Sequence, residues 1–212
     1  MRKRKRDKIV IAVPKGRVLE QLGARLERAG IPTEALTANS RRLVRDDEAS
    51  GLSYLLLKPD DVPTYVEYGA ADLGIVGRDV LMEREYDVLA PVDLDIGKCR
   101  MMVCGLPKES LAGKRERPLR VATKFPGIAE RHFRSKGTPV ELIFCQGSVE
   151  LAPLTGLADV IVDLVETGET LKQNGLVTLE KIADISSVVI ANRAGLKLRR
   201  TAIEPILDAL RK

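Results

Sequence analysis

The sequence of 212 residues has no tryptophan, one histidine, three cysteines and only 3% aromatic residues. The cysteines, Cys99, Cys104 and Cys145, form no C-x-x-C pair, which argues against a disulfide framework and a zinc site. The histidine, His132, lies on a segment that reads as an exposed helix face, and nothing near it supports a Ser/His or Cys/His dyad. These shortages disfavour zinc and acyl-enzyme chemistry.

Long apolar runs and an evenly spread charge are also missing. No apolar run approaches the ~20 residues of a membrane helix, and no signal-peptide stretch follows the basic start. The net charge is +5, but six of the 35 basic and one of the 30 acidic residues lie at positions 2–8, so the remainder has no net charge. We expect the basic tail to be solvated; the alternative is that it binds nucleic acid or an acidic partner. For the chain as a whole we expect a cytoplasmic location and neither nucleic-acid nor membrane partners.

Apolar runs alternate with amphipathic or capped segments along the chain. We expect strands at residues 9–13, 53–57, 73–76, 88–92, 99–106, 120–123, 140–145, 160–164 and 187–191. Helices are expected at residues 18–29, 78–85, 126–136, 148–158, 168–174 and 199–211, and another begins at residues 60–63. Apolar strands separated by helices predict an α/β fold with mostly parallel sheets covered on both faces.

One internal similarity bears on domain organisation. Residues 69–76 and 156–163 share a G-x-A-D-apolar pattern in which a helix end turns into a buried strand. The pattern is either a common turn that occurs twice or the mark of two similar lobes that face a cleft. The polar segment 105–118 fits a domain linker or a surface loop.

The segment from Asp159 to Leu171 carries the clearest chemical signal. An apolar strand is expected to end in Asp163, and Thr167-Gly-Glu-Thr170 then leads into a helix. Free backbone N–H groups, two hydroxyls and a glycine at such a turn suit an anion. A carboxylate at the strand end suits ribose hydroxyls or hydrated Mg²⁺. The alternative is a threonine-capped helix without a ligand.

Five segments, one of which overlaps residues 159–171, carry a resemblance to one family. The spacing of Glu150, Gly156, Ala158, Asp163 and Thr167-Gly168 resembles the signature of the ATP phosphoribosyltransferases. Other segments resemble family elements in the same order, namely Val13-Pro-Lys-Gly-Arg17, Ser40-Arg-Arg-Leu43, Asp72-Leu-Gly-Ile-Val-Gly-Arg-Asp-Val-Leu-Met-Glu83 and Arg120-Val-Ala-Thr-Lys-Phe-Pro126. Together these matches cover residues ~9–195, which is far more specific than any single motif.

The resemblance implies a two-lobed, periplasmic-binding-protein-like (type II) α/β fold with an interlobe cleft. It places lobe one at residues 1–97 plus 177–212 and lobe two, with the loop that binds phosphoribosyl pyrophosphate (PRPP), at residues 98–176. The chain ends soon after a basic helix, so we expect the short form without a C-terminal regulatory domain. That form works as a hetero-oligomer with a regulatory subunit similar to histidyl-tRNA synthetase.

The implied reaction transfers the phosphoribosyl group of PRPP to N1 of ATP, the first step of histidine biosynthesis, with Mg²⁺ as cofactor. No protein metal ligands are assigned, because substrate phosphates are expected to hold most of the Mg²⁺. The expected catalytic residues are Lys15, Arg17 and Arg41. The expected PRPP-binding residues are Glu150, Asp163, Glu166, Thr167, Gly168, Glu169 and Thr170. The expected ATP or cleft residues are Gly16, Gly77 and Asp79, although Asp79 is nearly as well explained as a helix cap.

Two other classes share the expected architecture. A solute-binding protein would normally carry an export signal, and none is recognisable. The effector domain of a transcription regulator needs a helix-turn-helix at one end, whereas residues 1–50 begin with a strand. Both alternatives are therefore less favoured than the transferase.

Overall fold

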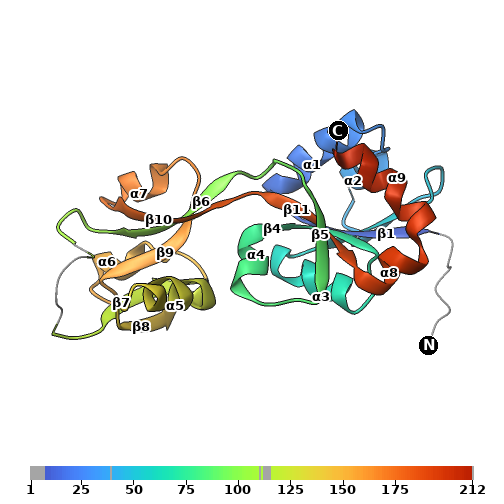
Figure 1. The fold of residues 1–212 in the computed structure, drawn as a ribbon. Helices are drawn as coiled ribbons and strands as arrows, with labels where there is room; N and C mark the ends of the chain where they lie inside the picture. The colour runs from blue at the N-terminus through green and yellow to red at the C-terminus, as the bar shows by residue number, and fades with distance from the viewer. Residues whose placement is uncertain (1–7, 39, 110, 112–115, 212) are drawn as a thin grey trace. The chain divides into compact units, whose positions relative to one another are not determined.

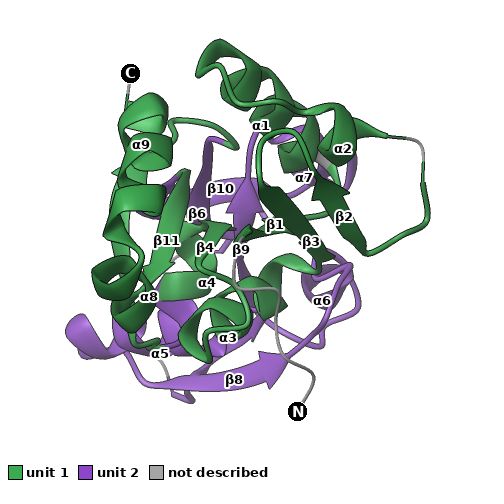
Figure 2. Ribbon diagram, turned by 90° about the vertical axis from the view of Figure 1, so that its right-hand side faces the viewer, with its two compact units in different colours: residues 1–81, 85–97, 186–212 green, residues 82–84, 98–185 purple. Residues whose placement is uncertain are grey.

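The computed structural model describes residues 8–38, 40–109, 111 and 116–211 (Figure 1). The predicted basic tail lies outside these residues apart from Lys8, as does part of the polar segment 105–118. The chain forms two compact units (Figure 2). Unit 1 comprises residues 1–81, 85–97 and 186–212, and unit 2 comprises residues 82–84 and 98–185. No helix of the described residues has the length and apolar character needed to span a membrane.

The sheet of unit 1 has the strand order β2-β3-β1-β4-β11-β5. Its strands are β1 (Ile9–Pro14), β2 (Val44–Asp47), β3 (Leu52–Leu57), β4 (Leu73–Gly77), β5 (Val88–Asp93) and β11 (Ser187–Asn192). β1 pairs in parallel with β3 and β4, whereas β2 and β11 run antiparallel to their neighbours. The carboxyl ends of β1, β3 and β4 therefore open on one edge of the sheet.

Helices cover both faces of this sheet because successive side chains of a strand alternate between faces. Ile11 and Val13 pack in a cluster with α1 (Arg17–Arg28), α2 (Glu34–Thr37) and α9 (Arg200–Arg211). Ala12 belongs to a second cluster with α3 (Val62–Glu67) and with Val80 of α4 (Arg78–Glu83). The short η1 (Pro59–Asp61) precedes α3, and α8 (Arg193–Leu198) follows β11.

The sheet of unit 2 has the order β10-β6-β9-β7-β8. Its strands are β6 (Cys99–Gly105), β7 (Leu119–Thr123), β8 (Val140–Phe144), β9 (Val160–Val165) and β10 (Val177–Ile185). α5 (Pro126–Ser135) packs on one face through Ile128 and Phe133. α6 (Leu151–Leu154) and α7 (Glu169–Gln173) pack on the other through Ala152 and Leu171. β7 is parallel to β8 and β9, so the carboxyl ends of these three strands share an edge.

The sheets correct one detail of the predicted α/β class, since they are mixed rather than mostly parallel. The pairs β2–β3, β4–β11, β5–β11, β6–β9 and β6–β10 are antiparallel. A strand buried on both faces reads as an apolar run in either direction, so the sequence pattern does not report strand direction.

The units also differ from the expected boundaries at two segments. Residues 177–185 were expected in lobe one, but they form β10, which pairs along its length with β6 of unit 2. Residues 82–84 belong to unit 2 as well. The predicted helix at 148–158 is confined to residues 151–154, since Ser148 (φ 48°) and Gly156 (φ 73°) adopt left-handed conformations on either side.

Candidate active site

The carboxyl edge of the unit 2 sheet brings together most residues of the predicted PRPP site. Lys124 directly follows β7, Glu150 lies in the connection between β8 and α6, and Glu166 directly follows β9. The carboxyl ends of parallel strands in open α/β sheets are where ligands bind. Of these three residues, Glu150 and Glu166 were predicted to bind PRPP, and Lys124 was not.

Asp163 lies within β9 rather than at its end, which corrects the expected strand boundary. The strand continues through Leu164 and Val165, which pair with β6. The Asp163 side chain is partly buried, and its Oδ1 accepts a hydrogen bond from the Leu164 N–H at 2.8 Å. Burial raises the pKa of this carboxyl, and the negative charge of Glu150 raises it further, whereas the Leu164 hydrogen bond and the positive charge of Lys124 lower it. The charges of Glu150 and Lys124 therefore both act on Asp163.

Residues 166–170 form the connection from β9 to α7. Gly168 adopts the left-handed conformation (φ 80°, ψ 4°) and is the residue before the helix begins. The Glu169 N–H donates to Thr167 Oγ1 at 3.3 Å. The side chains of Glu166 and Glu169 are exposed acids, so an anion bound here would be held by backbone N–H groups and threonine hydroxyls.

Lys124 is a residue of this edge that the sequence analysis did not assign to the site. It stands in the Arg120–Pro126 segment quoted for the resemblance, directly after β7. Its charge acts on Asp163, and its Nζ lies 5.7 Å from the centre of the Phe125 ring. Its position directly after a buried strand is visible in the sequence. The direction of that strand in the sheet, which the sequence does not report, is also needed to place Lys124 at this edge.

The expected unit 1 residues also collect at one sheet edge. Lys15, Gly16 and Arg17 follow β1, and Arg17 is the first residue of α1. Arg41 precedes β2, which the sequence analysis did not predict. Because β2 is antiparallel to β3, with Val44 opposite Leu55, its start lies toward the carboxyl end of β3. The antiparallel strand thereby brings Arg41 to the edge that Lys15 occupies, and both side chains are exposed.

Gly77 and Asp79 lie at the end of β4 and the start of α4. A Cβ added at Gly77 would stand 2.1 Å from Asp79 Oδ1, so the carboxylate folds back over the glycine. A side chain at position 77 would therefore displace the carboxylate of Asp79. Asp79 is a first-turn helix residue, where a negative charge also stabilises the helix dipole.

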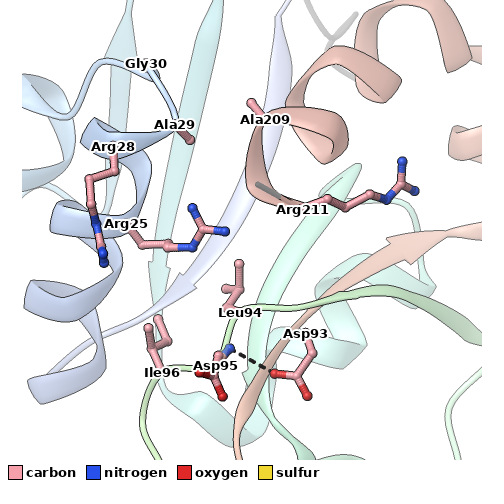
Figure 3. A pocket seen from close by; sticks show the side chains of 10 residues that line it. All are labelled: Arg25, Arg28, Ala29, Gly30, Asp93, Leu94, Asp95, Ile96, Ala209 and Arg211. Carbon is pink, nitrogen blue, oxygen red and sulfur yellow. Dashed lines mark hydrogen bonds between the residues drawn. The ribbon is translucent and has the colours of Figure 1, made fainter.

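A separate cavity of about 830 Å³ lies in unit 1 among α1, α9 and residues 93–96 (Figure 3). Arg25, Arg28, Asp93 and Asp95 contribute to its wall. The Arg25 guanidinium donates to the Leu210 carbonyl at 2.6 Å and so joins α1 to the end of α9. None of the described residues of the predicted site lines this cavity, so it forms no part of the candidate site.

Comparison with known proteins identifies the family. A family model described as "HisG: ATP phosphoribosyltransferase" matches residues 58–212. The chain belongs to the ATP phosphoribosyltransferase family. An ATP phosphoribosyltransferase of Sorangium cellulosum is 52% identical over 203 residues, covering 96% of this chain and 94% of that protein. One of Geobacter metallireducens is 48% identical over 209 residues, covering 97% and 98%.

A solved structure supports the same assignment. The ATP phosphoribosyl transferase (HisG:HisZ) complex from Thermotoga maritima matches with a TM-score of 0.81 and 35% identity, over 95% of this chain and 96% of that chain. The predicted family, transferase class and α/β fold are therefore confirmed.

Proposed function

We propose that this ATP phosphoribosyltransferase family member joins PRPP to N1 of ATP, releases pyrophosphate, and thereby performs the first step of histidine biosynthesis in the cytoplasm. The observation that carries the proposal is the shared edge in unit 2, where the Glu150–Asp163 pair accompanies the Thr167–Thr170 loop. A carboxylate pair beside a phosphate-binding turn matches the two ends of a phosphorylated ribose.

The reaction forms a bond between ribose C1 and adenine N1 and breaks the bond between C1 and the pyrophosphate oxygen. The ring nitrogen supplies its own lone pair, so the attack requires no strong general base. The transition state gathers positive charge on the ribose and negative charge on the leaving pyrophosphate. The protein therefore has to supply carboxylates near the ribose and cations near the pyrophosphate.

We assign to unit 2 the phosphoribosyl part of PRPP, which remains in the product. Glu150 and Asp163 accept hydrogen bonds from ribose hydroxyls, a role suited to two partly buried carboxylates. The loop of Glu166, Thr167, Gly168, Glu169 and Thr170 binds the 5′-phosphate, chiefly by its backbone. Exposure of this loop leaves it accessible to a ligand.

We assign to unit 1 the triphosphate of ATP and the pyrophosphate that leaves PRPP. Lys15 and Arg41 are exposed cations at one sheet edge, and Arg17 opens the 12-residue helix α1, whose N-terminus favours anions. We assign Lys15, Arg17 and Arg41 to pyrophosphate or ATP phosphates. Gly16, Gly77 and Asp79 are assigned to the ATP side of the site.

The side chains of unit 2 that could coordinate a metal ion are compatible with an Mg²⁺ held mostly by substrate phosphates. The described residues include no group of three or more His, Cys, Asp or Glu side chains arranged for a metal ion. Mg²⁺ commonly uses one or two carboxylates together with substrate phosphates, and Glu150 and Asp163 are the carboxylates of unit 2 that would supply them. When bound, Mg²⁺ neutralises charge on the leaving pyrophosphate.

We further assign the chain to a hetero-oligomer with a histidyl-tRNA-synthetase-like regulatory subunit. This assignment is supported by the HisG:HisZ complex among the similar structures and by relatives whose length the chain nearly matches. On this assignment we expect regulation by histidine to reside in the assembly, whose active and inhibited states would have to differ in histidine affinity.

The test is release of pyrophosphate with ATP, PRPP and Mg²⁺, measured with and without the partner subunit. We expect release only when both substrates are present, and sensitivity to histidine only when the partner is present. Ligand binding without turnover in every arm would favour a solute-binding role. Saturable binding of histidine to the isolated chain, with loss of its activity, would contradict the assignment of regulation.

A further inference from the structure

Glu83 holds the first turn of α5 through both oxygens of its carboxylate. Oε1 accepts a hydrogen bond from the Gly127 N–H at 2.8 Å, and Oε2 accepts one from the Ile128 N–H at 3.0 Å. The residue before the helix, Phe125, provides no side-chain cap, and Pro126 has no N–H to donate. Glu83 therefore serves as the cap that the local sequence of α5 lacks.

The backbone around Glu83 also lies directly against α5. A Cβ added at Gly127 would stand 2.7 Å from the Glu83 carbonyl oxygen, closer than a side chain permits. One turn later, the Arg131 guanidinium donates to the Met82 carbonyl. Residues 82–84 belong to unit 2, as α5 does. Gly127 and Arg131 of the helix both lie against this short segment.

α5 begins directly after the turn that carries Lys124. On the sheet side of this turn, the fully buried Thr123 donates its hydroxyl to the Val162 carbonyl at 2.6 Å. The same hydroxyl accepts the Phe125 N–H at 2.8 Å. Thr123 is also opposite Val162 in the β7–β9 register, next to Asp163. The turn is thus fixed by Thr123 at its start and by Glu83 at its end.

We propose that Glu83 is a positioning residue for phosphoribosyl transfer, because its cap on α5 holds Lys124 beside Asp163 and Glu150. This inference rests on the proposed function, which assigns that acid pair to PRPP. The charge of Lys124 partly offsets that of Asp163. If the cap is lost, the first turn of α5 loosens, Lys124 shifts, and two repelling carboxylates remain where the ribose has to bind.

The experiment is a double-mutant cycle on kcat/KM for PRPP with Glu83→Gln, Lys124→Gln and the double variant. Each single variant is expected to lose about tenfold, less than the roughly 100-fold that a misplacement of about 1 Å can cost. The double variant should lose little more than the worse single one, because both changes interrupt the same relationship. Glu130→Gln is the control, since Glu130 pairs only with Arg134 on the exposed side of α5 among the described residues. It should stay within twofold of the original chain.

If Glu83 had a purely structural role, the losses in kcat/KM of the two single variants would multiply in the double variant, which would overturn the proposal. Unchanged kcat/KM for Glu83→Gln would overturn it as well. If Glu83→Gln does not fold, the cycle is repeated with Gly127→Ala, which presses on the Glu83 carbonyl from the other side. Asp163→Asn separates the two proposals. If it leaves PRPP binding intact, the PRPP site itself is wrong; if it weakens binding while Glu83→Gln does not, only the role of Glu83 is wrong.

Discussion

Asp163 and Glu150 lie close enough to repel: burial raises the pKa of Asp163, and the charge of Glu150 raises it further. The pKa of Asp163 is therefore higher in the folded than in the unfolded chain, where it is near the ordinary 3.8. For a carboxyl with a raised pKa, stability is fully present below the unfolded value and is lost as pH rises through the folded value. Asp163 therefore makes unit 2 less stable at neutral pH than it is below the unfolded pKa of this carboxyl.

Asp163→Asn should therefore increase stability while it removes function. The amide oxygen can still accept the Leu164 N–H, and the buried charge is gone. We expect the free energy of unfolding at pH 7 to rise by roughly 1 kcal/mol, as is common when a functional charge is removed. PRPP binding should be lost. Urea unfolding and calorimetry measure the two effects, and a fall in stability at pH 7 would contradict the first.

Asp159 should show the opposite dependence on pH. Its carboxylate accepts two hydrogen bonds from Arg117, each 2.7 Å long, and one from the Arg120 N–H at 2.9 Å. Arg117 first, and Arg120 with it, holds the pKa of this carboxyl well below its usual range. Its stabilisation is therefore present above the unfolded pKa and is lost as pH falls through the folded one.

Asp159→Asn should lower the free energy of unfolding at pH 7 by about 1 to 3 kcal/mol, the usual cost of losing charge-assisted hydrogen bonds. The difference from the original chain should shrink in acid below about pH 4. Asp184→Asn is the control, because its pair with Lys181 is exposed and should contribute little. A pH-independent difference would mean that the charge of Asp159 is unimportant.

Gly168 and Gly175 offer a matched test of the phosphate loop. Both adopt positive φ, 80° and 68°, one before α7 and the other after it. A Cβ at Gly168 meets nothing closer than 3.8 Å and one at Gly175 meets nothing within 4 Å, so backbone strain is the main cost at each. Alanine should cost each about 1 kcal/mol of stability. Only Gly168→Ala should weaken PRPP binding, by roughly tenfold. Equal weakening in calorimetry would remove the loop from the site.

Arg17 and Arg28 occupy the first and last turns of α1. If Arg17 stabilises the leaving pyrophosphate, Arg17→Ala should lower kcat by about 100-fold while KM changes little, as for groups that act mainly in the transition state. Arg28→Ala should leave both constants unchanged, since Arg28 lies in the final turn. An effect confined to KM for ATP would reassign Arg17 to binding of the nucleotide.

The strands and helices that were predicted correctly are those that local periodicity of the sequence specifies. The apolar run at residues 9–13 and the amphipathic pattern at 18–29 correspond to β1 and α1, because each buries its own regular face. β2 and β10 were missed because both have many exposed positions and stand at sheet edges. An edge strand is specified by its partner's hydrogen bonds more than by its own apolar pattern.

The candidate site was predicted only as far as the motifs reach. Glu150 and Asp163 were grouped by resemblance, but Lys124 required strand direction, and Glu83 required the contact with α5. His132 was expected on an exposed helix face, yet its side chain is 11% exposed and stands 3.6 Å from Glu180 of the unpredicted β10. Burial lowers its pKa, although Glu180 opposes the change. Long-range pairings of this kind leave no local signal in the sequence.

The place of β11 in the unit 1 sheet has a consequence for biosynthesis on the ribosome. β11 lies between β4 and β5, and among the described strands β5 pairs only with β11. The sheet therefore lacks an inner strand until residues 187–192 have been made, although β1, β3 and β4 emerge early. Residues 98–185 are nearly sufficient for unit 2 and are complete before that point. β4 therefore has an unpaired apolar edge throughout the synthesis of residues 98–185, and during that interval the nascent chain is open to mispairing at this edge.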